Sequence, residues 1–174
     1  MKVLANDGIS KAGEIALKEG GIEFLEHRVA QEQLENFINE NQVDVLLVRS
    51  ATKVRKELID ACPSLKIIGR GGIGMDNIDV EYAREKGLYV INTPSASSRS
   101  VAEMVFAHFL SLARFLHESN RMMPLEGETK FKDLKKAYTN AVELSGKTLG
   151  VIGFGGIGKE VVKIGISLGM KIKV

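Results

Sequence analysis

Short, continuously apolar runs alternate with helical patterns along the first half of the chain, and this alternation constrains the fold more than any other feature. Such alternation is typical of parallel strands joined by crossover helices. Several runs are too uniformly apolar for a sheet with one solvent-exposed face, so helices should cover both faces. The pattern therefore predicts an α/β fold with a doubly wound parallel sheet, whose strands lie at residues 2–5, 22–26, 43–48, 65–69 and 88–91.

Helices are expected between these strands, at residues 11–19, 31–40, 53–61 and 80–86. Leu34 and Ile38 give the second of them an apolar stripe at helical spacing. Residues that cap or break a helix follow three of the four, namely Gly20 with Gly21, Pro63 and Gly87.

A loop rich in proline and serine at residues 94–98 ends this first domain, which we place at residues 1–98. Residues 99–174 are expected to form a linker helix and the first strand, helix and strand of a second, incomplete α/β domain. Ser100 and Glu103 match a capping box and predict a helix to about His117. That helix is apolar nearly all round, which favours packing between domains or subunits. The charged stretch 122–143 predicts a loop plus a short helix.

A G-x-G-x-x-G pattern follows the predicted strand at 148–152 and opens the next helix. Its residues are Gly153, Phe154, Gly155, Gly156, Ile157 and Gly158. In this context the pattern is typical of a dinucleotide-binding turn, because its glycines allow a tight turn, close approach to a pyrophosphate and close helix packing. The alternative is a glycine-rich turn that binds nothing. The acidic residue that would select NAD over NADP is expected about 20 residues further on, past Val174.

Two arginines follow the third and fourth predicted strands, at the edge of a parallel sheet where ligands gather. If those strands are neighbours, Arg49 and Arg70 can converge on one small dianion. Bare backbone amides and a hydroxyl could add to such a site. The candidate substrate-binding residues are Arg49, Ser50, Arg70, Gly71, Gly72 and Ile73. The residues alone leave open the alternative that these are surface arginines beside a glycine turn.

Charge and composition exclude several classes of partner. There are 24 Lys and Arg against 22 Asp and Glu, so nothing predicts binding to nucleic acid. The most apolar stretch, 101–116, is too short to span a membrane, and the amino terminus shows no export signal. One cysteine, Cys62, predicts a buried thiol in the cytoplasm. The histidines are on the linker helix or after a strand, so we nominate no catalytic base, and we nominate no metal site.

Five segments together resemble the D-2-hydroxyacid dehydrogenase family in both order and spacing. They are VRSATKV (48–54), GRGGIGMDNID (69–79), NTP (92–94), SVAE (100–103) and GKTLG (146–150). The first of them is most similar to the branch of the family that acts on 3-phosphoglycerate. The resemblance covers nearly the whole chain.

The resemblance implies a flavodoxin-like substrate domain followed by a Rossmann domain that binds NAD. It further implies hydride transfer between NAD and a small D-2-hydroxy acid, with 3-phosphoglycerate, a serine-biosynthesis substrate, as the expected one. Arg49, Ser50 and Arg70 would contact the phosphate or carboxylate of the substrate, and the helix from Ser100 would form a homodimer interface. The family's catalytic His, Glu and Arg would lie past residue 174, so this fragment should be inactive by itself.

The chain departs from the family pattern in two places. Many relatives carry an arginine where Gly156 stands, so one charged contact to the pyrophosphate is expected to be absent. The segment before Gly146 lacks the tryptophan that is common in relatives. A second hypothesis on the same fold is a non-catalytic protein that senses NAD(H), of the corepressor kind. The pair of Arg49 and Arg70 argues against it, because a sensor needs no paired cations for a substrate phosphate.

Overall fold

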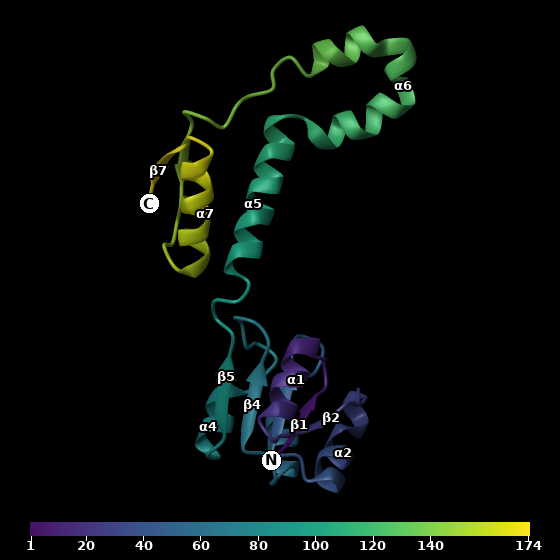
Figure 1. Ribbon diagram of the computed structural model, residues 1–174, viewed down its shortest axis with the longest axis vertical. Helices are drawn as coiled ribbons and strands as arrows, with labels where there is room; N and C mark the ends of the chain where they lie inside the picture. The colour runs from purple at the N-terminus through teal and green to yellow at the C-terminus, as the bar shows by residue number, and fades with distance from the viewer. The chain divides into compact units, whose positions relative to one another are not determined.

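The computed structural model describes all 174 residues, which form two compact units, Met1–Pro94 and Ser95–Val174 (Figure 1). The predicted division after residue 98 therefore differs from the division between the units by four residues. The helix that opens the second unit begins at Ser98, so the predicted division lies in its first turn.

The first unit is a five-stranded sheet of order β2-β1-β3-β4-β5 in which every neighbouring pair is parallel. This confirms the predicted fold class. The strands begin and end within two residues of the predicted bounds. They are β1 (Lys2–Ala5), β2 (Glu23–Leu25), β3 (Val45–Val48), β4 (Ile67–Arg70) and β5 (Tyr89–Asn92).

The helices of this unit are α1 (Lys11–Glu19), α2 (Leu34–Asn41), α3 (Lys56–Ala61) and α4 (Val80–Glu85), and a 3-10 turn, η1 (Gln31–Gln33), precedes α2. The first helix has its predicted bounds because the Ser10 hydroxyl caps its start and Gly21, at a φ of 69°, follows its end. The third helix begins three residues later than predicted. Its expected first turn is extended instead, since Val54 forms a β-bridge with Ile78.

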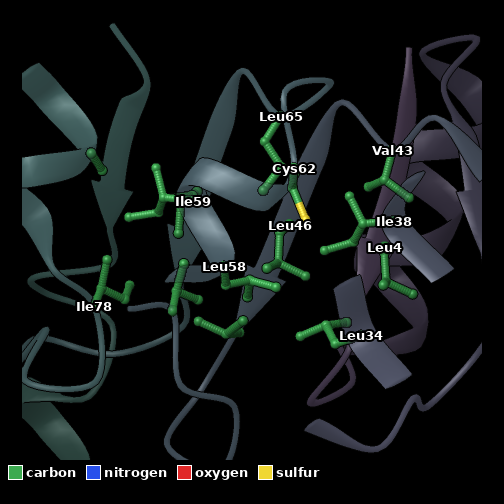
Figure 2. Close-up of a cluster of buried hydrophobic side chains, with 14 residues drawn as sticks. Leu4, Leu34, Ile38, Val43, Leu46, Leu58, Ile59, Cys62, Leu65 and Ile78 are labelled. Carbon is green, nitrogen blue, oxygen red and sulfur yellow. The ribbon is translucent and has the colours of Figure 1, made fainter. Parts of the chain in front are cut away.

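The core of the first unit lies between the sheet and the three helices α2, α3 and α4 (Figure 2). Leu4, Leu46 and Ile68 are paired across β1, β3 and β4, and none of the three side chains is exposed. Leu34 and Ile38 of α2 cover them, as their spacing predicted. The opposite face of the sheet carries Leu47, Gly69 and Ile91.

Cys62 lies inside this core, and burial together with the charge of Glu35 raises its pKa to about 11 from 9.0. Two pKa units correspond to about a hundredfold less thiolate, the form that reacts. We therefore expect a disulfide reagent to modify the native chain at least about a hundredfold more slowly than the chain in concentrated guanidinium chloride. Absorbance of the released thiol measures both rates, and similar rates would contradict the burial of Cys62.

The second unit contains α5 (Ser98–Ala113), α6 (Leu116–Ala137), β6 (Thr148–Gly150), α7 (Gly156–Ser167) and β7 (Lys171–Lys173). The two strands are parallel and joined by α7. Figure 1 shows α5 lying beside α7, where Ala102 and Phe106 pack with Leu149 and Val161 in a small core. The predicted strand, helix and strand are therefore present, although the first strand ends two residues early.

The predicted capping box is wrong. The long helix begins at Ser98 with Ser97 as its N-cap residue, so Ser100 is already inside it. Glu103 instead accepts a hydrogen bond from Arg99 Nε at 2.9 Å. The pattern misled because the same glutamate lies three residues after a serine, as in a capping box, and four residues after Arg99, with which it pairs inside the helix.

The predicted end of this helix and the loop predicted after it are also wrong. Phe115 adopts a left-handed conformation, with a φ of 52°, and ends α5 short of His117. A second helix, α6, then runs to Ala137 through most of the stretch expected to be a loop, with Pro124 inside it and a kink at Lys130. Its side chains are mostly exposed, which explains the weak apolar periodicity. Neither this helix nor any other is both long and apolar enough to cross a membrane.

Candidate functional site

A groove of about 960 Å³ opens at the carboxyl edge of the first sheet. One side of α1 and the loop after β1 form one wall, and the ends of β3, β4 and β5 form the other. Leu47, Gly69 and Ile91 are among its lining residues. A Cβ atom on Gly69 would lie 2.7 Å from Leu47 Cδ2, so glycine leaves room for the neighbouring leucine.

The structure brings three of the six predicted substrate-binding residues to this groove. Arg49, Arg70 and Gly71 line it, whereas Ser50, Gly72 and Ile73 lie in the adjoining loops outside the lining. β3 and β4 are neighbours in the sheet, with Val48 paired to Arg70, so both arginines leave the same edge on adjacent strands.

The two arginines differ in their surroundings. The side chain of Arg49 is exposed. That of Arg70 is half-buried and folds back on the backbone, where Nε donates to the carbonyl oxygen of Arg49 at 3.2 Å and Nη1 donates to that of Gly74. A Cβ atom on Gly72 would lie 2.7 Å from Arg70 Nη1, so glycine makes room for this conformation.

Sequence reasoning missed three polar residues of this edge, Asp7, Thr52 and Asn77. The Asp7 carboxylate lines the groove and accepts hydrogen bonds from Arg49 N at 2.6 Å and from Thr52 Oγ1 at 2.7 Å. Asn77 Nδ2 donates to the carbonyl oxygens of Arg49 and Thr52 at 2.9 and 2.6 Å. The available signal was position, because Asp7 follows β1 by two residues at the same edge as Arg49.

Burial raises the pKa of Asp7, but hydrogen bonds from the Thr52 hydroxyl and from three backbone N–H groups, those of Arg49, Thr52 and Ala51, lower it by more. The net pKa lies below the ordinary 3.8. The carboxyl group is therefore ionised throughout the physiological pH range. Two arginines and one carboxylate thus share this end of the sheet.

The lowered pKa of Asp7 has a measurable consequence for stability. Its folded-state pKa is below its unfolded-state pKa, so its contribution is present above the unfolded value and is lost as pH falls through the folded value. We expect Asp7→Asn to cost about 1 kcal/mol near neutral pH, allowing for solvent screening, and less below about pH 4. Urea unfolding, followed by NMR signals of the first unit, measures the loss of stability at neutral and at acidic pH. A pH-independent difference would show that the charge of Asp7 does not stabilise the fold.

The three histidines take no part in either candidate site. His27 is exposed and packs edge-on against Phe37, with ring centroids 5.4 Å apart. His108 and His117 are exposed on α5 and α6. None of them lines the groove.

In the second unit the glycine pattern forms the turn from β6 into α7, as its spacing predicted. Gly153 has a φ of 95°, a conformation that side chains disfavour. A Cβ atom on Gly158 would overlap the carbonyl oxygen of Gly153, so glycine is needed for the helix to approach the turn. Phe154 is half exposed, and Lys159 Nζ lies 6.0 Å from the centre of its ring.

The amino end of α7 fits the pyrophosphate of a dinucleotide. A Cβ atom on Gly155 would meet nothing within 4 Å, so an anion can approach the backbone there. The N–H groups of the first turn, from Gly156 to Gly158, have no partner within the helix. A Cβ atom on Gly156 would lie 2.9 Å from Ser98 Oγ, which is buried without a hydrogen-bond partner. Glycine at position 156 therefore accommodates Ser98, where an arginine would require that serine to move.

Comparisons with known proteins agree with these features. The family model described as D-isomer specific 2-hydroxyacid dehydrogenase, catalytic domain, matches residues 3–161. The hydroxypyruvate reductase of Thermotoga maritima is 45% identical over 172 residues, which are 98% of this chain and 54% of that protein. The D-3-phosphoglycerate dehydrogenase of Methanocaldococcus jannaschii is 42% identical over 173 residues, which are 99% of this chain and 31% of that protein.

Among solved structures, the NAD⁺-bound 3-phosphoglycerate dehydrogenase of Entamoeba histolytica matches with a TM-score of 0.72 at 30% identity. The match covers 100% of this chain and 53% of that one. The chain thus spans about half the length of the first curated relative and about a third of the second. Since the family model covers most of the chain, the chain belongs to the D-isomer specific 2-hydroxyacid dehydrogenase family.

Proposed function

We propose that the protein containing this chain transfers hydride between NAD and a small anionic D-2-hydroxy acid, with 3-phosphoglycerate and 3-phosphohydroxypyruvate as the substrate pair. The observation that carries the proposal is the placement of Arg49 and Arg70 on the ends of adjacent strands, where both line one groove. The two guanidinium groups together exceed the charge of the neighbouring Asp7 carboxylate, and both can donate hydrogen bonds to a phosphate.

The names of the relatives support this substrate class, and they differ in whether the substrate carries a phosphate group. One is named hydroxypyruvate reductase and another D-3-phosphoglycerate dehydrogenase. The oxidised substrates that these names imply differ by a phosphate group. Arg49 is the residue whose exposed side chain can respond to that difference.

In this proposal the first unit binds the substrate and the second binds the cofactor. Arg49 and Arg70 hold the phosphate or carboxylate and fix the orientation of the acid. The first-turn N–H groups of α7 hold the pyrophosphate, while Gly155 allows its close approach. When bound, NAD supplies the acceptor for the hydride. The proton of the hydroxyl group requires a base outside this chain, so the 174-residue chain alone should turn over no substrate.

The proposal is tested by NADH oxidation with the full-length protein, comparing 3-phosphohydroxypyruvate with hydroxypyruvate. We expect the phosphorylated acid to have the lower KM. Arg49→Gln should raise that KM by about tenfold to a hundredfold, because it removes one charged hydrogen-bonding partner of the phosphate. The KM for hydroxypyruvate should change much less.

Arg84→Gln is the matched control, because Arg84 is exposed in the last turn of α4, away from the groove lining. It should leave both KM values unchanged. An equal effect of Arg49→Gln on both acids would reject the phosphate as the group that Arg49 binds. Tight NADH binding without turnover of either acid would instead favour the NAD(H)-sensing, corepressor-like alternative.

The proposal extends to assembly and location. Val101, Met104, Leu110 and Leu112 on α5 are exposed, which supports a homodimer formed through this helix. Sedimentation of Leu112→Glu beside the unchanged protein tests it, and an unchanged mass would reject α5 as the interface. The single, deeply buried thiol of Cys62 is consistent with a reducing cytoplasm.

A further inference from the structure

Three segments at the carboxyl edge of the first sheet are joined through the backbone N–H and carbonyl groups of Arg49. Its N–H donates to Asp7 Oδ2, in the loop after β1, at 2.6 Å. Its carbonyl oxygen accepts from Arg70 Nε at 3.2 Å, at the end of β4, and from Asn77 Nδ2 at 2.9 Å, in the segment that follows β4. The backbone of Arg49 is therefore held from both sides while its side chain remains exposed.

Thr52 closes the same network from the other end of the loop after β3. Its backbone N–H and its hydroxyl donate to Asp7 at 3.1 and 2.7 Å. The hydroxyl also accepts from Asn6 Nδ2 at 2.8 Å, and the carbonyl oxygen accepts from Asn77 Nδ2 at 2.6 Å. The Thr52 and Asn6 side chains are each 4% exposed, so this anchor is shielded from water.

The negative charge of Asp7 distinguishes a direct electrostatic effect on the ligand from a positioning effect. Asp7 lines the groove together with Arg49 and Arg70, and a carboxylate at this position repels an anionic ligand. Its direct electrostatic effect on substrate binding is therefore unfavourable. Any benefit of Asp7 to the site must come from geometry, through the three hydrogen bonds that it accepts from Arg49 and Thr52.

We infer that Asp7 is a positioning residue for substrate binding, which acts with Thr52 by fixing the Arg49 peptide so that the Arg49 guanidinium reaches the anionic group of the substrate. The inference rests on the proposed function, because it explains how that same site holds its anion. Misplacing a binding group by about 1 Å is enough to lower binding or rate by up to about a hundredfold. A residue that never touches the substrate can therefore control its affinity.

Steady-state kinetics of the full-length protein test the inference. Asp7→Ala should raise the KM for 3-phosphohydroxypyruvate by about tenfold or more and leave kcat nearly unchanged, since the lost interaction affects bound substrate and transition state alike. Thr52→Val, which removes the hydroxyl and keeps the shape, should raise the same KM by a smaller factor. Thr52→Ser, which keeps the hydroxyl, should retain the original KM.

Asp44→Ala is the matched control for loss of a structural carboxylate. Asp44 accepts from Lys2 N at 2.8 Å and pairs with Lys66, at the opposite edge of the same sheet. It should reduce stability without a change in KM. If Asp44→Ala and Asp7→Ala raise the KM equally, Asp7 stabilises the fold and does not position Arg49.

A second measurement decides the inference even if the full-length protein shows no turnover. In NMR spectra of the 174-residue chain, the Arg49 amide proton should lie far downfield because it donates to a carboxylate, and Asp7→Ala should remove that shift. Titration with inorganic phosphate should perturb Arg49 and Arg70, with about tenfold weaker binding in Asp7→Ala. Absence of wild-type turnover with this result would reject only the proposed function. Equal or tighter phosphate binding by Asp7→Ala would overturn the inference, because Asp7 would then act only as a repelling charge.

Discussion

Replacing Gly158 with alanine is expected to separate α7 from the turn that follows β6 and to abolish tight dinucleotide binding. A Cβ atom at this position would overlap the carbonyl oxygen of Gly153, and a backbone atom cannot rotate away as a side chain can. The turn or the helix must shift, at a cost of about 3 kcal/mol to the second unit. Amide hydrogen exchange of α7 measures the stability, and NADH fluorescence measures the binding.

Two other glycines of the same region serve as controls. A Cβ atom on Gly150, in β6, or on Gly155, before α7, would meet nothing within 4 Å. Gly150→Ala should leave exchange and binding unchanged, whereas Gly155→Ala should keep the helix stable and weaken binding, because its methyl group would occupy the space above the helix end. Unchanged exchange in Gly158→Ala would show that the close packing of this turn is not needed.

Replacing Leu46 with alanine is expected to destabilise the first unit by about 2–5 kcal/mol, a large share of the stability of a small domain. Leu46 has no exposed surface and is paired in the sheet with Leu4 on one side and Ile68 on the other. Figure 2 shows Leu46 within the buried cluster. Both neighbouring strands are fixed by the backbone ladder and cannot close over the cavity.

Cys62 reports on the unfolding of this unit alone, since it is the only cysteine and lies in the same core. The rate of its modification in increasing urea measures the loss of stability. Ile15→Ala is the control, because Ile15 on α1 is 48% exposed, and it should cost less than about 1 kcal/mol. Equal modification profiles for Leu46→Ala and the unchanged chain would mean that the core repacks around the cavity.

The elements that the sequence predicted best have both a periodic interior and a local end signal. α1 has its predicted bounds because Ser10 caps one end and a glycine in the left-handed conformation follows the other. The strands β1, β3 and β4 were recognisable because they are largely buried and mostly apolar. Their ends were less certain, since one residue more or less in a strand changes its apolar pattern little.

The region between α5 and β6 lacked these signals. α6 is exposed along most of its length, so it has no clear apolar stripe, and its charged sequence predicted a loop plus a short helix instead. The N-cap of α5 was predicted at Ser100 and lies at Ser97, because Glu103 pairs with Arg99 inside the helix and does not cap its start.

The candidate site was only partly predictable for a related reason. Arg49, Arg70 and Gly71 could be inferred from local sequence because each lies at or just after the carboxyl end of a strand in a parallel sheet. The contribution of Asp7, Thr52 and Asn77 depends on three loops meeting, over separations of 25 to 45 residues. No local pattern encodes such a meeting, because it exists only in the folded chain.

The groove and the main core of the first unit share a single residue, Val48. In the proposed function, substrate preference and apolar packing are therefore specified by nearly separate sets of amino acids. Substitutions in the groove lining should then change which acid binds with little effect on the packing of the core, and substitutions in the core should leave the choice of acid unchanged. Val48 belongs to both sets, so variation there should be restricted.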